Sequence, residues 1–372
     1  MFDRLVKDIL FALRPLRRHP AFSFLLILTV AVAIGGNVAI FSVLEGIILR
    51  PMAYPDGEEI LAIWETPDEQ ERWYQPFTGP DYFDVKEEAR TLKEFGVIHL
   101  RSLNVAGEGE PVRVQAGAVT ASLFRVLGMQ PSQGRYFTEE EEFDGNHRVV
   151  VLSHGFWQDQ FGGEDGVVGR QLSVDGEPYE IIGIMPPDFR APTPWGGRDR
   201  SRVWVPLVLP RDGSGRGSHW LAAYGRMADG VTPEEVEAEL NVIAERLSQA
   251  YPDTNAMTTM WVQPMMARTL GGISSVLIYL LIVVGLVLLI ACANVASMLL
   301  ARGMNRSSEF AIRASMGAGR RGLVRQLLTE SLLLSLIGGS VGVLMAFWGV
   351  DALKAVMPDS IPRIAAIQVN TT

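Results

Sequence analysis

The chain has 372 residues, of which 48% are hydrophobic and 20% are charged. Its formal net charge is −9, and no basic patch points to a nucleic-acid partner. A single cysteine, Cys292, excludes an intrachain disulfide, so the folded regions must be stabilised by their buried cores.

Three windows without a charged residue are Ala21–Leu44, Thr269–Ala301 and Ser331–Val350. A helix needs about 20 apolar residues to cross a bilayer core. We therefore predict three transmembrane helices, over residues 21–45, 271–301 and 327–350. The first window follows a basic start and could belong to a signal peptide. Its apolar run, however, exceeds the roughly 7–15 residues typical of such a peptide, which favours a membrane anchor.

The first 20 residues form a basic segment with an apolar face. Phe2, Leu5 and Ile9 would lie near one helical face, with Arg4 and Lys7 elsewhere. We predict a cytoplasmic helix in the membrane interface over residues 1–20. An ordinary soluble cap helix is the alternative interpretation.

Charge is unevenly distributed along the chain. Residues 46–270 contain 20 Lys and Arg against 35 Asp and Glu, whereas the remainder contains 13 against 7. Basic flanks precede the first window and follow the second, and such flanks favour the cytoplasm. The acidic region between these windows is therefore expected outside the cytoplasm, and it is long enough to fold on its own core.

Within this acidic region, helical and strand-like patterns alternate. Asp81–Phe95 and Ser122–Gly128 have helical spacing, and Val149–Ser153 is a β-branched run. Leu172–Met185 places Asp-Gly between two strand-like runs, which predicts a hairpin. Thr232–Pro252 opens with a capping box and continues with apolar residues at helical spacing. The predicted fold class is a membrane protein: a helical transmembrane bundle with an α+β extracytoplasmic domain over 46–270.

Two matches to enzyme or nucleotide motifs fail on context. Gly317–Gly322 spells G-x-G-x-x-G, but no strand precedes it, as a dinucleotide site requires. Gly338–Gly342 spells G-x-S-x-G inside the third window, where a strand-to-helix turn is not expected. Small residues spaced for close helix packing in the membrane are instead predicted to be Gly35, Gly36, Gly338, Gly342 and Ala346.

Other candidate chemistry is weak. The acidic run Glu139–Glu142 is interpreted as a solvated face, and the five histidines have no metal-ligand spacing. None of the four lysines follows a glycine, so the sequence lacks the Gly-Lys of a P-loop. We predict no metal, no cofactor and no enzymatic activity, and any ATPase must lie elsewhere.

The segment over residues 302–326 is a short, arginine-rich connection between two apolar windows. Glu309 and Arg313 are spaced to pair on a helix, and Phe310 and Ile312 offer apolar contacts. Such a helix is suited to docking in a groove of a cytoplasmic partner. A plain loop at the lipid headgroups, with arginines serving only topology, is an equally open interpretation.

Several stretches resemble a known family. EFAIRASMGAGRRGLVRQLLTESLLLSLIGGSVGVLMAF is similar to the cytoplasmic loop and following span of FtsX-like ABC transporter permeases. FRVLGMQPSQGRYF, VVVLSHGFWQDQFGG and VDGEPYEIIGIMPPDF resemble the extracytoplasmic core domain of the MacB-type branch, including its large duplicated permeases. The resemblance covers nearly the whole chain in the expected order.

The resemblance implies a multi-pass permease subunit in the bacterial inner membrane, working with a separate cytoplasmic ABC ATPase and a second permease copy or half. Its expected function is to couple ATP hydrolysis to movements of the extracytoplasmic domain, for export or extraction of an unknown substrate. The residues that match the family's ATPase-coupling helix are Glu309, Phe310, Ala311, Ile312, Arg313 and Gly317.

The pattern departs from the family at its end. Family members have four spans per unit, whereas three are predicted here, with an extracytoplasmic tail over residues 351–372. The sequence therefore also allows an inactive, truncated permease fragment. A membrane-anchored extracytoplasmic binding or sensing module without transport is a further alternative, and the residues leave the substrate open.

Overall fold

The computed structural model describes residues 20–44, 54–67, 74–107, 110–193, 199–212, 214–256, 258–265, 273–305, 315 and 320–356. The chain forms two compact units. One unit comprises residues 51–271, and the other combines residues 1–50 with residues 272–372.

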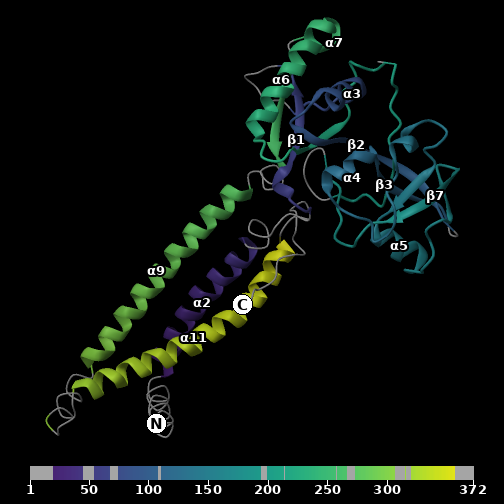
Figure 1. Cartoon of the computed structure of the whole chain (residues 1–372). Helices are drawn as coiled ribbons and strands as arrows, with labels where there is room; N and C mark the ends of the chain where they lie inside the picture. The colour runs from purple at the N-terminus through teal and green to yellow at the C-terminus, as the bar shows by residue number, and fades with distance from the viewer. Residues whose placement is uncertain are drawn as a thin grey trace. The chain divides into compact units, whose positions relative to one another are not determined.

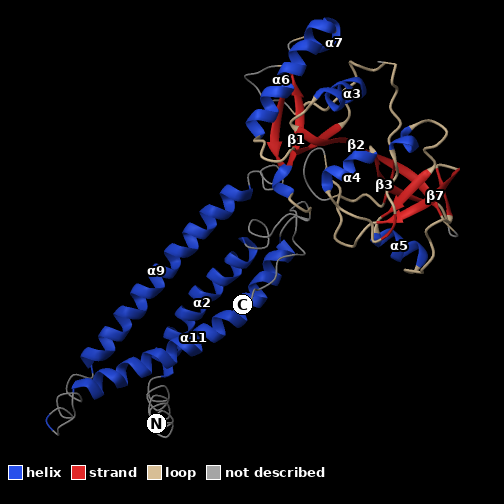
Figure 2. Ribbon diagram, viewed as in Figure 1, coloured by secondary structure: helices blue, strands red, loops and turns tan. Residues whose placement is uncertain are grey.

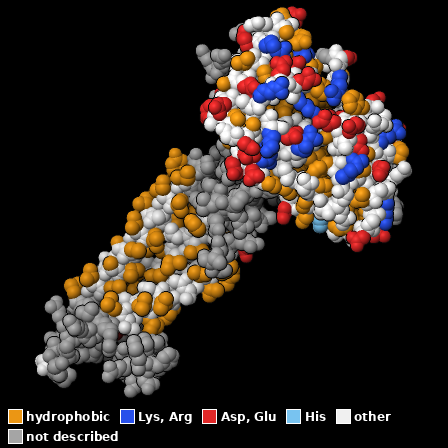
Figure 3. Space-filling model, in the orientation of Figure 1, with side chains coloured by type: hydrophobic (Ala, Val, Ile, Leu, Met, Phe, Trp, Pro, Cys, Tyr) orange, Lys and Arg blue, Asp and Glu red, His pale blue; other side chains and the backbone are white. Residues whose placement is uncertain are grey.

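The second of these units contains three long helices, α2 (Pro20–Leu44), α9 (Ile273–Asn305) and α11 (Arg320–Val356). Each is long and apolar enough to cross a membrane. α2 packs against both of the others, and Figure 1 shows the three helices running side by side. On the face drawn in Figure 3, hydrophobic side chains predominate over these helices, whereas charged side chains are spread across residues 51–271.

Residues 51–271 form an α+β domain, and Figure 2 shows its helices and strands. Its strands are β1 (Ile60–Thr66), β2 (Leu92–Ala106), β3 (Val112–Val119), β4 (Gln133–Gly134), β5 (Val149–Leu152), β6 (Gln171–Val174), β7 (Glu177–Ile184), β8 (Val203–Pro206), β9 (Ala222–Met227) and β10 (Thr259–Pro264). Its helices are η2 (Gly57–Glu59), α3 (Gly79–Glu88), α4 (Ala121–Leu127), η3 (Glu139–Glu142), α5 (His154–Phe161), α6 (Pro233–Ala250) and α7 (Pro252–Asn255).

The strands form one mixed sheet. Its order is β10-β1-β9-β2-β3-β8-β5-β7-β4, and β6 pairs with β2 and β7. The β3–β8 and β5–β7 pairs are parallel, and the other pairs are antiparallel. The predicted membrane protein with a large extracytoplasmic α+β domain is therefore the fold that the structure adopts.

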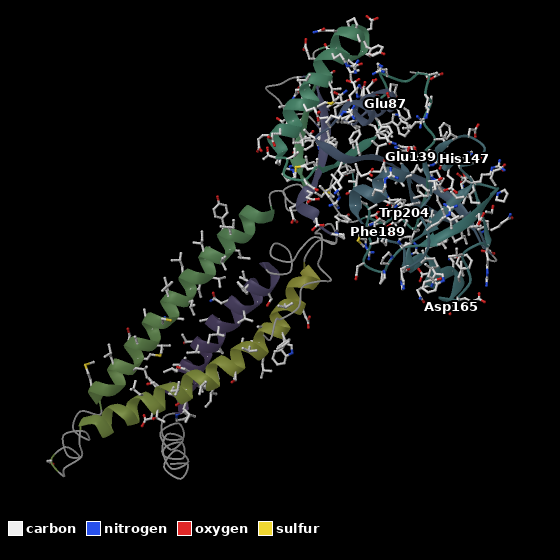
Figure 4. The ribbon with its side chains drawn as sticks, viewed as in Figure 1. Glu87, Glu139, His147, Asp165, Phe189 and Trp204 are labelled. Carbon is white, nitrogen blue, oxygen red and sulfur yellow. The ribbon has the colours of Figure 1, made fainter. Side chains whose placement is uncertain are left out.

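Both faces of the central strands are buried. In β1, Leu61 and Ile63 face one hydrophobic core, whereas Ala62 and Trp64 face the other. Side chains of a strand alternate between faces, so a strand buried on both faces is apolar throughout. α3 and α6 contribute to the first core and α4 to the second. In the second core, the rings of Phe189 and Trp204 pack edge to face, 5.0 Å apart (Figure 4).

Local signals at three positions are confirmed. Thr232 and Glu235 form the predicted capping box of α6, in which the Thr232 side chain accepts from the Glu235 amide. Gly128 ends α4 in the left-handed conformation, with φ of 65°. Asp175 and Gly176 both have positive φ, as a two-residue turn between β6 and β7 requires.

The helix predicted over Asp81–Phe95 is shorter than expected. α3 ends at Glu88, and β2 begins at Leu92. The Glu239 carboxylate on α6 accepts hydrogen bonds from the backbone amides of Arg90 and Thr91. A side chain 148 residues away therefore satisfies the amides at which the helix stops.

Candidate functional site

The α2–α11 contact is a seam of small residues, which we call the glycine seam (Ala31, Gly35, Gly338, Gly342 and Ala346). A Cβ added at Gly35 would lie 2.8 Å from the Gly342 carbonyl oxygen. A Cβ added at Gly342 would lie 2.8 Å from the Ala31 carbonyl oxygen. Real Cβ atoms do not approach backbone oxygen so closely, so both positions require glycine for this packing.

The glycine seam continues along α11 in both directions. A Cβ on Gly338 would lie 2.8 Å from the Val30 Cβ, and Ala346 is almost fully buried. Small residues that let two backbones approach replace the hydrophobic driving force that is absent between helices in lipid. Gly36, also predicted to take part in packing, differs, because a Cβ there would meet no described atom within 4 Å.

A polar side chain joins α2 to α9. The Asn37 Nδ2 donates a hydrogen bond to the Ala33 carbonyl oxygen of its own helix at 2.8 Å. The same nitrogen lies 3.4 Å from the Val284 carbonyl oxygen on α9. An amide group within an apolar bundle is held in place by such bonds, because leaving it unpaired in lipid is costly.

Glu330, on α11, is an ionisable residue within the predicted span over residues 327–350. It lies in the apolar stretch Leu328–Ala352 and is 6% exposed. An ionisable residue within a membrane helix normally faces the bundle interior and has a functional or structural partner. The uncharged window of the sequence begins at Ser331, so it leaves out Glu330 by one residue. The burial of the Glu330 side chain becomes visible only in the structure.

The serine motif at Gly338–Gly342 lies within α11. The Ser340 hydroxyl donates a hydrogen bond to the Leu336 carbonyl oxygen, one turn earlier, at 2.9 Å. A nucleophile elbow instead holds its serine on a sharp turn between a strand and a helix. The helical context rules out that geometry at Ser340, and the flanking glycines belong to the glycine seam.

The acidic run Glu139–Glu142 is not the solvated face that was expected. Glu139, labelled in Figure 4, pairs with Lys86 at 3.1 Å and Arg125 at 2.9 Å. Glu142 is buried, and its Oε1 accepts a hydrogen bond from the Ala121 amide at the start of α4. Burial raises the pKa of Glu142, whereas the ion pairs lower the pKa of Glu139. The run, which forms η3, therefore binds to α3 and α4.

Among the described residues, no group of three or more His, Cys, Asp or Glu side chains is arranged to hold a metal ion. The proposed ATPase-coupling residues, Glu309–Arg313 and Gly317, lie outside the described residues. The predicted interfacial helix over residues 1–20 also falls outside them, except for Pro20.

Comparisons with known proteins identify relatives of this chain. The sequence profile of the MacB-like periplasmic core domain matches residues 23–243, and that of the FtsX-like permease C-terminal region matches residues 258–370. The chain is 25% identical over 260 residues to the macrolide export ATP-binding/permease protein MacB of Salmonella paratyphi A. It is 26% identical over 249 residues to the protein of that name from Escherichia coli strain K12.

These matches cover 69% and 66% of this chain but only 39% and 37% of the two relatives. The chain thus spans less than two-fifths of the length of the relatives that it matches. Among solved structures, the periplasmic region of MacB from Actinobacillus actinomycetemcomitans aligns with a TM-score of 0.41 at 17% identity. That alignment covers 60% of this chain and 93% of the solved one.

Proposed function

Because the chain belongs to the family of ABC transporter permeases with a MacB-like periplasmic core domain and an FtsX-like permease region, we propose that it couples ATP hydrolysis on a separate cytoplasmic ATPase to movement of its extracytoplasmic domain. This movement drives the export or extraction of a substrate at the bacterial inner membrane. The relatives' names, which combine ATP binding with a permease, support the ATPase partner.

The observation that carries this proposal is the glycine seam. In sequence, α2 leads into the extracytoplasmic domain, and α11 begins at Arg320, within the arginine-rich segment over residues 302–326. A displacement of α11 along α2 would therefore transmit a movement of that segment to the start of the domain. Backbone-to-backbone contacts such as Gly342 to Ala31 support this, because no large side chains must repack as the helices shift.

A disulfide between α2 and α11, beyond the glycine seam, tests the proposal. A Cβ on Gly349 would lie 3.6 Å from the Ala39 Cβ, within the 3.5–4.5 Å range of disulfides. In a Cys292→Ser background, Ala39→Cys with Gly349→Cys should cross-link on oxidation and stop ATPase-coupled transport, and a reductant should restore it. The Ala39→Cys single variant should be unaffected by oxidant. Full activity of the cross-linked protein would show that the helices need not move.

We propose that the ATPase binds the coupling segment Glu309–Arg313 and Gly317. Its amphipathic pattern and its match to the family's coupling helix support this assignment. An ATPase should co-purify with the intact chain but not with an Ile312→Asp, Arg313→Glu variant. Arg325→Glu, on α11 in the same basic stretch, serves as the control. Failure to recover an ATPase with any of these proteins would favour the membrane-anchored binding module.

We also propose that a second permease copy or half packs against α9. Large apolar side chains are exposed along most of this helix, including Ile282, Leu286, Leu289 and Ile290. Cys292, the only cysteine, is exposed on the same helix. A bifunctional thiol reagent should therefore cross-link two copies through Cys292 in membranes, and Cys292→Ser should abolish the product. A monomer that never cross-links would contradict a symmetric α9 contact.

A further inference from the structure

One corner of the extracytoplasmic domain contains a group of charged or titratable side chains that the proposed function does not use. Glu65 lies on β1, Asp81 lies in the first turn of α3, and Arg216 and His219 lie on the segment over residues 214–221. Glu65 and Asp81 are both 0% exposed. Carboxylates are almost never fully buried unless they are paired, so each of them needs an explanation.

Both carboxyl oxygens of Asp81 accept hydrogen bonds. Its Oδ1 accepts from the Arg216 guanidinium at 2.5 Å and from the Asn255 amide at 3.0 Å. Its Oδ2 accepts from the Thr78 hydroxyl at 2.7 Å. Arg216 also pairs with Asp84 at 2.7 Å. Arg216 thus already serves two carboxylates, and charge-assisted hydrogen bonds of this kind are among the stronger ones in proteins.

Glu65 has no comparable set of partners. Its Oε2 lies 2.9 Å from the Nδ1 of His219, and that nitrogen also lies 2.9 Å from the Pro76 carbonyl oxygen. A carbonyl oxygen only accepts, so Nδ1 carries a hydrogen that Pro76 and Glu65 must share. Among the described residues, neither carboxyl oxygen of Glu65 receives a well-aligned hydrogen bond.

The electrostatic balance of this corner favours a bound proton. An ionised Glu65 would add a third negative charge to Asp81 and Asp84, against a single arginine. Burial is the main cause that raises the pKa of Glu65 to about 8, and the nearby Asp81 charge raises it further. The contact with Glu65 raises the pKa of His219 as well.

We propose that Glu65 and His219 form a proton-binding site that fastens the segment over residues 214–221 to β1 and α3. A proton held by this pair removes the repulsion between Glu65 and Asp81. Loss of the proton leaves a buried negative charge that is relieved when the segment opens to water. Acidification of the extracytoplasmic side therefore tightens this corner, and alkalinisation loosens it.

The segment is placed to carry this change to other elements. Its last residue, Leu221, exchanges backbone hydrogen bonds with Phe77, the residue just before the α3 cap Thr78. Arg216 also stacks on the Tyr251 ring at 3.8 Å, at the junction of α6 and α7. Opening of the segment would therefore release contacts to β1, α3 and α7 together.

The sign of the pH dependence follows from linkage. The closed corner holds the Glu65 proton up to about pH 8, whereas an open, hydrated Glu65 has the ordinary pKa of 4.5. The opening constant should therefore rise about tenfold per pH unit between these two values and level off above the higher one.

Infrared spectroscopy of the full chain in detergent tests whether the proton is there. The wild-type minus Glu65→Gln difference spectrum at about pH 6 should show the carbonyl stretch of a buried protonated carboxyl, and this band should vanish at about pH 9.5. His219→Asn keeps a donor without a titrating ring, so its band should persist to higher pH. A difference spectrum without such a band near neutral pH would overturn the proposal.

Hydrogen exchange of the same proteins tests the fastening. After correction for intrinsic rates, amides of residues 214–221 should open more readily as the pH rises in the wild type. Glu65→Gln, which mimics the protonated acid, should remove that dependence. Glu58→Gln, an exposed glutamate on η2, should leave it intact. A pH dependence that survives in Glu65→Gln would assign the effect to another group and refute the site.

Discussion

At the scale of single residues, Gly342 shows that the lack of a side chain allows two helices to pack closely. Its position lets α11 approach the Ala31 and Gly35 backbone of α2, with virtual Cβ distances of 2.8 Å and 3.2 Å. Gly36 lies one residue from Gly35 yet faces open space among the described atoms. Two adjacent glycines of one helix therefore have different roles, because helix rotation directs only one of them at α11.

Alanine at these two positions gives a matched comparison. Both substitutions gain about 1 kcal/mol of helix propensity. Gly342→Ala also meets the Ala31 carbonyl, and overpacking of this kind typically costs about 1–3 kcal/mol. We expect Gly342→Ala to lower the midpoint of thermal unfolding in detergent and Gly36→Ala to hold or raise it. Equal stability of the two variants would show that the glycine seam tolerates side chains.

At the scale of elements, Glu239 shows how one helix determines where another ends. Its carboxylate, on α6, accepts from the amides of Arg90 and Thr91 between α3 and β2. These hydrogen bonds lower the pKa of Glu239, although burial partly opposes them. Helix α3 therefore depends on the packing of α6 for its end, which explains why local spacing overestimated its length.

The Glu239 bonds predict a specific acid sensitivity. A lowered pKa in the folded state stabilises the fold above the unfolded pKa of about 4.5, and this stabilisation is lost as the pH falls through the folded value. Glu239→Gln should therefore lower the free energy of unfolding at neutral pH by about 1 kcal/mol, which is measured as a lower urea midpoint. The loss of stability below pH 4.5 should also be less steep than in the wild type. Glu234→Gln, exposed on the first turn of α6, is the control. A steep decline that survives in Glu239→Gln would exclude this role.

At the scale of the whole molecule, the charge asymmetry determines orientation. The region over residues 46–270 is acidic, and the flanks of the apolar helices are basic. Basic flanks favour the cytoplasm, so we expect the domain to lie outside the cytoplasm and the segment over residues 302–326 to lie inside it.

Single cysteines test this orientation. In a Cys292→Ser background, Asp165→Cys in the domain (Figure 4) should react with a membrane-impermeant maleimide in intact spheroplasts. Met304→Cys, exposed at the end of α9, should react only after the membrane is opened. Labelling of both residues from one side of the membrane would contradict the assignment.

Features that depend on neighbours within a few residues could be predicted from the sequence. The three apolar helices, the Thr232 capping box, the Gly128 helix end and the Asp175–Gly176 turn are of this kind. Each arises from hydrophobic length, from a side chain bonding to the nearest free amides, or from a backbone angle that few residues adopt.

Tertiary structure alone decided which polar groups are buried and what they face. The sequence places Glu65, Glu142 and Glu330 among other residues without distinguishing them from solvated glutamates. Only packing brings Glu65 to His219, brings Glu142 to the Ala121 amide and buries Glu330. The physical reason is that desolvation and pairing depend on elements far apart in the chain, whereas propensity and hydrophobic length are properties of each segment by itself.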